Sequence, residues 1–246
     1  MMAMLKKCLR NSPIFAFNQL SRDRWVAAQA ATLPEGSRVL DVGAGSCPYR
    51  PLFSHCEYRT QDFTGLQADQ LRYSGYGEID YVCDATAIPV PDSSFDVILC
   101  TEVLEHLAEP LEAMREFSRI LKPGGKLILT APLGSGLHQE PHHYYGGFTP
   151  YWYKRFLAAY GFAKIEVEAN GGSFRFFSQE SLRFARETRP LKLGMPLVAE
   201  LAWLPFWAFI FPMLALVIPL WSGMLDRFDR ERRFTVGYHV TAERQQ

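Results

Sequence analysis

The chain has 246 residues, which is long enough for one large domain with a substantial hydrophobic core. Its 26 basic and 26 acidic residues give a formal net charge of zero, so no global charge attracts it to nucleic acid or to anionic surfaces. Five cysteines without CxxC or Cys/His zinc spacing predict a reducing, cytoplasmic compartment and no structural metal.

Residues 1–36 are predicted to form an N-terminal helical segment. Charged residues at positions 6, 7 and 10 interrupt the apolar side chains there, so no stretch reaches the length of a signal-peptide core. We therefore do not expect export.

Residues 37–172 alternate short β-rich runs with helical stretches, a pattern typical of βα units around a parallel sheet. Six runs rich in Val, Ile, Leu or aromatic residues are predicted strands: 38–42, 58–62, 79–83, 95–100, 126–130 and 163–168. This pattern predicts an α/β core with a doubly wound, Rossmann-like sheet.

Two helices are predicted in the second half of this core. The apolar face of the first is formed by Leu111, Met114, Phe117, Ile120 and Leu121. Pro123 and the two glycines after it are expected to end that helix. The second helix has Thr149 as its N-cap, Pro150 at its first position and Gly161 at its end.

Residues 173–233 differ in composition and are predicted to be a membrane-associating insert. Its first part is basic and amphipathic, whereas 201–225 carry no charge and would form a helix roughly 37 Å long, enough for a bilayer. Pro212 at the midpoint and basic residues at both ends favour instead a hairpin that re-enters or rests on the membrane. A buried helical cap and a single membrane span remain as alternatives.

Residues 234–246 are predicted to contain a last strand, with Phe234, Val236, Tyr238 and Val240 on one side. If that strand completes the sheet of the core, the chain leaves and returns on one face of a membrane, which a single crossing forbids.

The stretch RVLDVGAGSCPYR is predicted to be a strand followed by a tight turn. Gly43 and Gly45 allow the backbone of that turn to pass close to a ligand. A dinucleotide-binding fingerprint requires a third glycine where this chain has Pro48, which argues against a nucleotide-dependent oxidoreductase.

Three aspartates accompany that turn. Asp41 lies in the first predicted strand, and Asp62 and Asp84 end the second and third. Ligands of open α/β sheets bind at the carboxyl ends of the strands, so we expect these carboxylates to converge on one crevice.

The segments VLDVGAGSCPYR, DATAIPVPDSSFDVILCTEVLEHL and LKPGGKLILTAP, with Asp62 between the first two, together resemble the successive motifs of class I S-adenosylmethionine-dependent methyltransferases, type 11 branch. The resemblance covers about residues 36–172 and the last strand. It implies S-adenosylmethionine as cofactor and a seven-stranded sheet whose last strand is antiparallel and inserted beside the sixth.

The resemblance also implies which residues contact the cofactor. They are Asp41, Gly43, Ala44, Gly45, Asp62, Phe63, Asp84, Ala85, Thr101 and Glu102. The first four would surround the amino-acid portion, and Asp62 would hold the ribose hydroxyls. Phe63, Asp84 and Ala85 would contact the adenine, and the last two residues would line the cleft near the sulfonium.

The stretch LGSGLHQEPHHYYGGFT follows the fifth predicted strand, where this fold borders the methyl pocket. Methyl transfer needs chiefly alignment and exclusion of water, but a hydroxyl acceptor also has to lose a proton. His138 is the candidate base, with His142 and His143 as further catalytic candidates. His106 is expected to brace the helix beside the cofactor, and no metal is expected, because H-x-x-x-H-H lacks further ligand spacing.

These observations predict O-methylation of a lipid-linked, glycan or quinone-like acceptor at the cytoplasmic face of a membrane, by a peripheral or monotopic enzyme. The alternatives are a catalytically silent cofactor-binding module and an oxidoreductase of Rossmann type. No nucleic-acid partner is expected.

Overall fold

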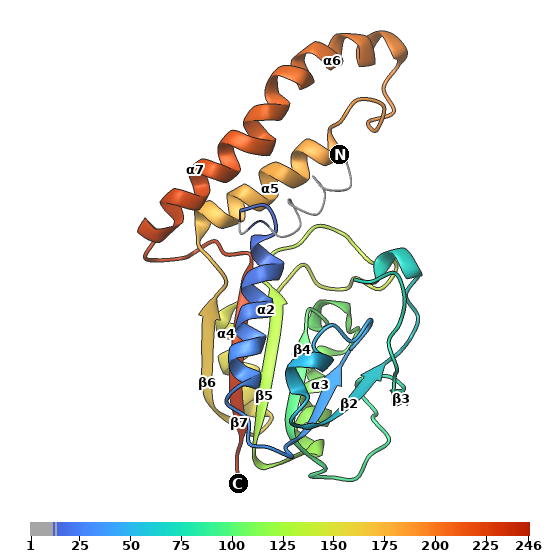
Figure 1. The fold of residues 1–246 in the computed structure, drawn as a ribbon, viewed down its shortest axis with the longest axis vertical. Coiled ribbons are helices and arrows are strands. Elements are labelled where there is room, and N and C mark those ends of the chain that lie inside the picture. Colours follow the sequence, from blue (N-terminus) through green and yellow to red (C-terminus); the bar gives the residue numbers. More distant parts are fainter. Residues whose placement is uncertain (1–11, 13) are drawn as a thin grey trace. The chain divides into compact units, whose positions relative to one another are not determined.

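The computed structural model describes Ser12 and residues 14–246. The chain forms two compact units (Figure 1). The sheet unit comprises Arg22–Glu168 and Gly237–Gln246, and the helical unit comprises Ala169–Val236 with the residues up to Ser21. The predicted N-terminal helical segment lies partly outside the described residues, and its described helix is α2 (Phe17–Ala30).

The sheet has seven strands in the order β3-β2-β1-β4-β5-β7-β6. Their bounds are β1 (Arg38–Val42), β2 (Glu57–Asp62), β3 (Tyr81–Val82), β4 (Phe95–Thr101), β5 (Leu121–Pro132), β6 (Phe162–Ala169) and β7 (Gly237–Arg244). Strands β2, β1, β4 and β5 pair in parallel, whereas β7 runs antiparallel to β5 and lies between it and β6. The Rossmann-like fold with an antiparallel last strand beside the sixth is confirmed.

The core of the sheet unit forms where apolar helix faces meet the strands. Val26 and Ala30 of α2 join a buried cluster with Val39 of β1 and with Val97 and Leu99 of β4. The other helices of this unit are α3 (Pro110–Ile120), α4 (Pro150–Ala159) and the 3-10 helices η1 (Arg50–Phe53), η2 (Ala68–Gln70) and η3 (Leu104–His106).

The helix ends agree with the sequence at α4 but not at α3. The Thr149 side chain accepts a hydrogen bond from the backbone N–H of Trp152 at 3.2 Å, as predicted for an N-cap. In contrast, α3 ends at Ile120 because Leu121 is extended and begins β5. Pro123 therefore lies inside β5 instead of ending the helix, consistent with its bias of the preceding residue toward extended backbone.

Strand β7 also begins later than predicted. It starts at Gly237, so Phe234 precedes it and is 61% exposed. Tyr238 and Val240 share one face of the strand, as predicted, but the opposite face is also covered, because helices pack on both faces of the sheet. Successive side chains point to opposite faces, and His239 stacks on Trp25 of α2 while Tyr238 contacts Tyr153 of α4.

The helical unit is built on α5 (Ser173–Glu187) and a long helix beside it (Figure 1). The long helix consists of α6 (Leu197–Pro212), the π-helical turn η4 (Met213–Val217), α7 (Ile218–Leu225) and the 3-10 turn η5 (Asp226–Phe228). The 32 residues Leu197–Phe228 are continuous, and this is the one described helix long and apolar enough to cross a membrane.

The predicted hairpin bend at Pro212 is therefore wrong. The helix continues through Pro212, and five π-helical residues, Met213–Val217, follow it without a change of direction that would reverse the chain. The chain turns back instead between α5 and α6, in residues 188–196. Asp226 in the last turn of the long helix and Asp229 just after it accept hydrogen bonds from the backbone N–H groups of Arg175 and Ser173, respectively, at the start of α5.

Candidate active site

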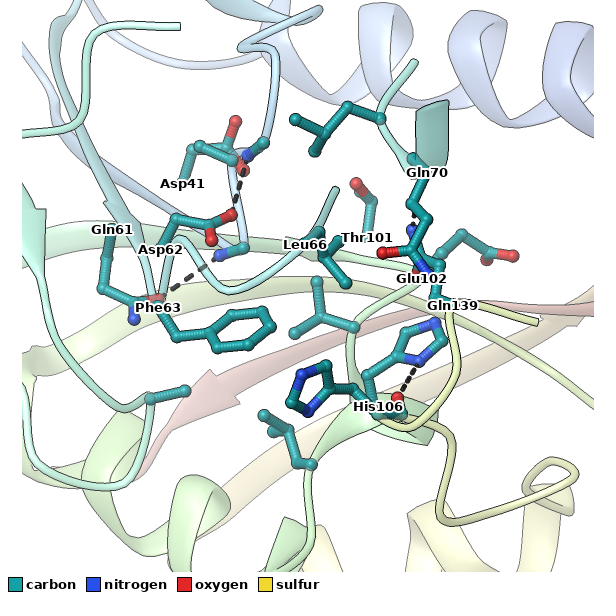
Figure 2. Close-up of a pocket in the computed structure, with 18 of the residues that line it drawn as sticks. Asp41, Gln61, Asp62, Phe63, Leu66, Gln70, Thr101, Glu102, His106 and Gln139 are labelled. Atoms are coloured by element: carbon teal, nitrogen blue, oxygen red, sulfur yellow. Dashed lines mark hydrogen bonds between the residues drawn. The ribbon is translucent and has the colours of Figure 1, made fainter. Parts of the chain in front are cut away.

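A cavity of about 320 Å³ lies at the carboxyl ends of the strands in the sheet unit (Figure 2). All ten residues expected to contact the cofactor line it: Asp41, Gly43, Ala44, Gly45, Asp62, Phe63, Asp84, Ala85, Thr101 and Glu102. They come from the ends of β1, β2, β3 and β4, the edge at which open α/β sheets bind ligands. Residues far apart in the chain thus meet in one crevice.

The turn after β1 is held tightly against the end of β2. The backbone N–H groups of Gly43 and Ala44 donate to the carbonyl of Gln61 at 2.8 and 3.0 Å. Gly43 has a φ of +69°, and a Cβ there would lie 2.3 Å from the side chain of Val103. Only glycine fits this position, which leaves a backbone-lined cradle in the cavity wall.

The carboxylate of Asp62 connects that cradle to the next loop. Its Oδ2 accepts a hydrogen bond from the N–H of Gly45 at 2.9 Å (Figure 2). Its Oδ1 accepts one from the N–H of Thr64 at 2.8 Å. Burial raises the pKa of Asp62, and these two hydrogen bonds oppose the rise. Each oxygen keeps a second lone pair, so the residue fits the expected contact with two ribose hydroxyls.

Asp41 is a buried carboxyl group, only 2% exposed, in the lining of the cavity. Burial raises its pKa to about 7, although a hydrogen bond from the hydroxyl of Tyr58 opposes the rise. A positively charged ligand beside it would restore the ionised form. This environment fits the ammonium group in the amino-acid portion of S-adenosylmethionine.

Phe63, Asp84 and Ala85 line another part of the same cavity. The exposed carboxylate of Asp84 accepts hydrogen bonds from both the N–H and the hydroxyl of Thr86, at 2.8 and 2.6 Å. The ring of Phe63 meets that of His142 edge to face, with centroids 5.0 Å apart.

Glu102 is fixed by groups on two sides. Its carboxylate pairs with Arg22 of α2 at 3.0 Å and accepts a hydrogen bond from the Thr130 hydroxyl of β5 at 2.9 Å. Its φ of +54° is the left-handed region that a non-glycine residue rarely adopts. Such backbone strain is typical of functional sites.

Several lining residues were missed by sequence reasoning, among them Arg22, Gln70 and Gln139. The side chain of Gln70 donates to the carbonyl of Glu140 at 3.2 Å, and that of Gln139 donates to the carbonyl of Gln70 at 3.1 Å. These reciprocal bonds join two cavity-lining loops that are remote in sequence. No local motif marks them.

The four histidines are distributed differently from expectation. His106 and His142 line the cavity, whereas His138 and His143 are not among its described lining residues. The His138 ring centroid nevertheless lies 4.8 Å from that of His106 and 4.6 Å from that of His143. Burial lowers the pKa of His106 to about 4, so its ring is neutral at neutral pH.

Comparisons with known proteins agree with this geometry. A family model described as a methyltransferase domain matches residues 40–129. An uncharacterized methyltransferase of Mycobacteroides abscessus is 30% identical over 195 residues, covering 72% of this chain and 71% of that protein.

A demethylmenaquinone methyltransferase of Renibacterium salmoninarum is 34% identical over 121 residues. The match covers 47% of this chain and 50% of that protein, so the chain spans about half the length of this relative. Among solved structures, a Haemonchus contortus phosphoethanolamine N-methyltransferase 2 in complex with S-adenosyl-L-methionine shares the fold. Its TM-score is 0.52 at 16% identity, covering 98% of this chain and 60% of that one.

Proposed function

This chain belongs to the class I S-adenosylmethionine-dependent methyltransferases, and we propose that it methylates a hydroxyl group of an amphipathic, quinone-like or other lipid-linked acceptor at the cytoplasmic face of a membrane. The observation that carries the enzymatic part is the single cavity that gathers all ten expected cofactor residues. The acceptor class is supported separately, by the helical unit and by a relative named for a quinone substrate.

We assign the cofactor contacts from the cavity. The cradle formed by Gly43, Ala44 and Gly45, with buried Asp41 below it, suits the amino-acid portion. Asp62 suits the ribose diol, because each of its oxygens has a lone pair to spare. S-adenosylmethionine supplies a methyl group already activated on its sulfonium, so these residues have to position it and exclude water.

The histidines beside the cavity are the groups available to an acceptor hydroxyl. The His106 ring lies in the wall, and His138, the predicted base, contacts it from the neighbouring loop. We therefore retain the proposal that His138 assists removal of the acceptor proton. Replacing it should lower turnover on a hydroxyl substrate while leaving cofactor affinity unchanged.

The helical unit supports a membrane location. Large apolar side chains of the long helix are exposed, for example Val198, Phe209 and Met224. Strands β6 and β7 flank this unit in the chain and are neighbours in one sheet, so a single membrane crossing between them is ruled out by connectivity. A helix that lies in the membrane–water interface agrees both with the exposed apolar side chains and with the connectivity that rules out a single crossing.

The decisive experiment supplies methyl-labelled S-adenosylmethionine and a membrane lipid extract to the enzyme. Label in an organic-phase product is the expected result. Calorimetry with S-adenosylmethionine and S-adenosylhomocysteine is run in parallel on the wild type and on Asp62→Ala, which should bind more weakly. Cofactor binding without any labelled product would favour the catalytically silent alternative, and no binding by the wild type would end the proposal.

A further inference from the structure

A glutamate and two histidines beside the cavity have the geometry of a metal site. Glu105 and His106 end η3, and His138 lies in the loop after β5. One ligand atom from each residue lies within 4.8 Å of the other two. Sequence spacing missed this group, because His138 is remote in the chain from the other two residues.

Hydrogen bonds to backbone carbonyls orient the imidazole rings of His106 and His138. The Nδ1 atom of His106 lies 2.5 Å from the carbonyl oxygen of His142, and Nδ1 of His138 lies 2.9 Å from that of Gly136. A carbonyl only accepts, so in each neutral ring the proton is on Nδ1 and Nε2 has a free lone pair. Metal-binding histidines typically have this arrangement, with the other ring nitrogen bonded to a backbone carbonyl or carboxylate.

The carboxyl group of Glu105 supplies an independent observation. It is 1% exposed, and its Oε2 has no hydrogen-bond partner among the residues that the structure describes. Its Oε1 faces Nε2 of His106 at 3.8 Å. A buried carboxyl oxygen without a partner is costly, and a cation held between these groups would remove that cost.

We propose that Glu105, His106 and His138 bind a divalent transition-metal ion of the zinc type, through one carboxylate and two Nε2 atoms. Two imidazoles and a carboxylate form a known zinc-binding set that leaves a fourth position open. Ligand atoms around tetrahedral zinc are about 3.3 Å apart, given bonds of about 2.0 to 2.2 Å. His138 is exposed, so rotation of its side chain can close the remaining gap.

The site lies at the wall of the cavity, because His106 lines it. On the proposed function, on which this role rests, the open position would take the oxygen of the acceptor hydroxyl. With the metal bound, both Nε2 lone pairs would be occupied, so His138 would assist deprotonation through the metal and would not itself take up the proton. The O–H bond would break, its proton would pass to water, and the oxygen would keep the electron pair while the cation stabilised its charge. Binding of the metal itself does not depend on that role.

The test titrates the full chain, after treatment with EDTA, with zinc chloride in a calorimeter. We expect one ion bound per chain, and the visible absorption of tetrahedral cobalt when Co²⁺ replaces zinc. His138→Ala and Glu105→Gln should each weaken zinc binding by at least about tenfold. His142→Ala is the matched control, since it removes an imidazole from the same loop and should leave zinc affinity unchanged.

Binding of S-adenosylhomocysteine to the same samples shows that each variant is folded. His138 is exposed, so His138→Ala removes a metal ligand without disturbing the core. No stoichiometric zinc binding by a wild type that binds S-adenosylhomocysteine would overturn the metal site and leave the proposed function standing. Equal zinc affinity in wild type and His138→Ala would also overturn it. Zinc binding without S-adenosylhomocysteine binding would support the site and count against the proposed function.

Discussion

At the scale of single residues, Asp41 connects burial to cofactor binding. Its pKa of about 7 means that the carboxyl group is mostly protonated in the free protein at about pH 6.5. A cationic ligand favours the ionised form, so binding of S-adenosylmethionine should release up to about three quarters of a proton at that pH. The affinity for S-adenosylmethionine should then rise with pH between about 6 and 7, because a smaller fraction of Asp41 has to be deprotonated on binding.

Calorimetry at about pH 6.5 in buffers of different ionisation enthalpy measures that proton directly. Asp41→Asn is the control, because its amide has no proton to lose and keeps nearly the same shape. Equal proton release by wild type and variant would assign the proton to another group.

Residue-scale prediction succeeded where a side chain ends a strand. Asp41, Asp62 and Asp84 could be placed together because parallel strands deliver their carboxyl ends to one edge. Arg22 could not be placed, because α2 brings it to the cavity wall and to Glu102 over a long sequence separation. Gln139 could not be placed either, because its loop reaches the cavity through a hydrogen bond to the distant Gln70. The site residues therefore divide into those fixed by strand registry and those fixed by tertiary contact.

At the scale of elements, the turn after β1 offers a test of why glycine is needed there. Gly43→Ala adds a Cβ at a positive φ and also 2.3 Å from Val103. Gly36 has a similar φ of +76° with nothing within 4 Å of the added Cβ, so Gly36→Ala has the backbone strain without the collision.

Gly36→Ala should lower the free energy of unfolding by about 1 to 2 kcal/mol from backbone strain, and Gly43→Ala by about 1 to 3 kcal/mol more from overpacking. Urea denaturation measures both values. We also expect cofactor binding to be lost only in Gly43→Ala. Equal destabilisation in the two variants would show that Val103 moves aside.

Elements were predictable to the extent that local rules act alone. The N-cap at Thr149 was correct because the capping bond is made within four residues. The end of α3 was missed because β5 pairs with β4 from Leu121 onward and draws the chain out of the helix. The course of the long helix was missed because the helix continues through Pro212 into a π-helical turn, whereas a bend was expected there.

At the scale of the whole molecule, the helical unit is an insertion between two neighbouring strands of the sheet unit. The seven-stranded order could be predicted because the alternation of strands and helices matches a known family, and the helical insertion before the last strand could be predicted from the change of composition after residue 172. Its long exposed apolar helix would be an aggregation hazard in water unless another surface covers it. A lipid surface is the cover consistent with the proposed acceptor.

Flotation with lipid vesicles tests that conclusion with two matched substitutions. Phe209 of α6 and Tyr151 of α4 are exposed aromatic residues, 83% and 81% respectively. Burial of a large apolar side chain contributes about 1.5 to 3 kcal/mol, so Phe209→Glu should weaken vesicle binding by about tenfold or more. Tyr151→Glu introduces the same charge in the sheet unit and should leave vesicle binding unchanged. If both variants float as the wild type does, the exposed face of the long helix is not the membrane contact.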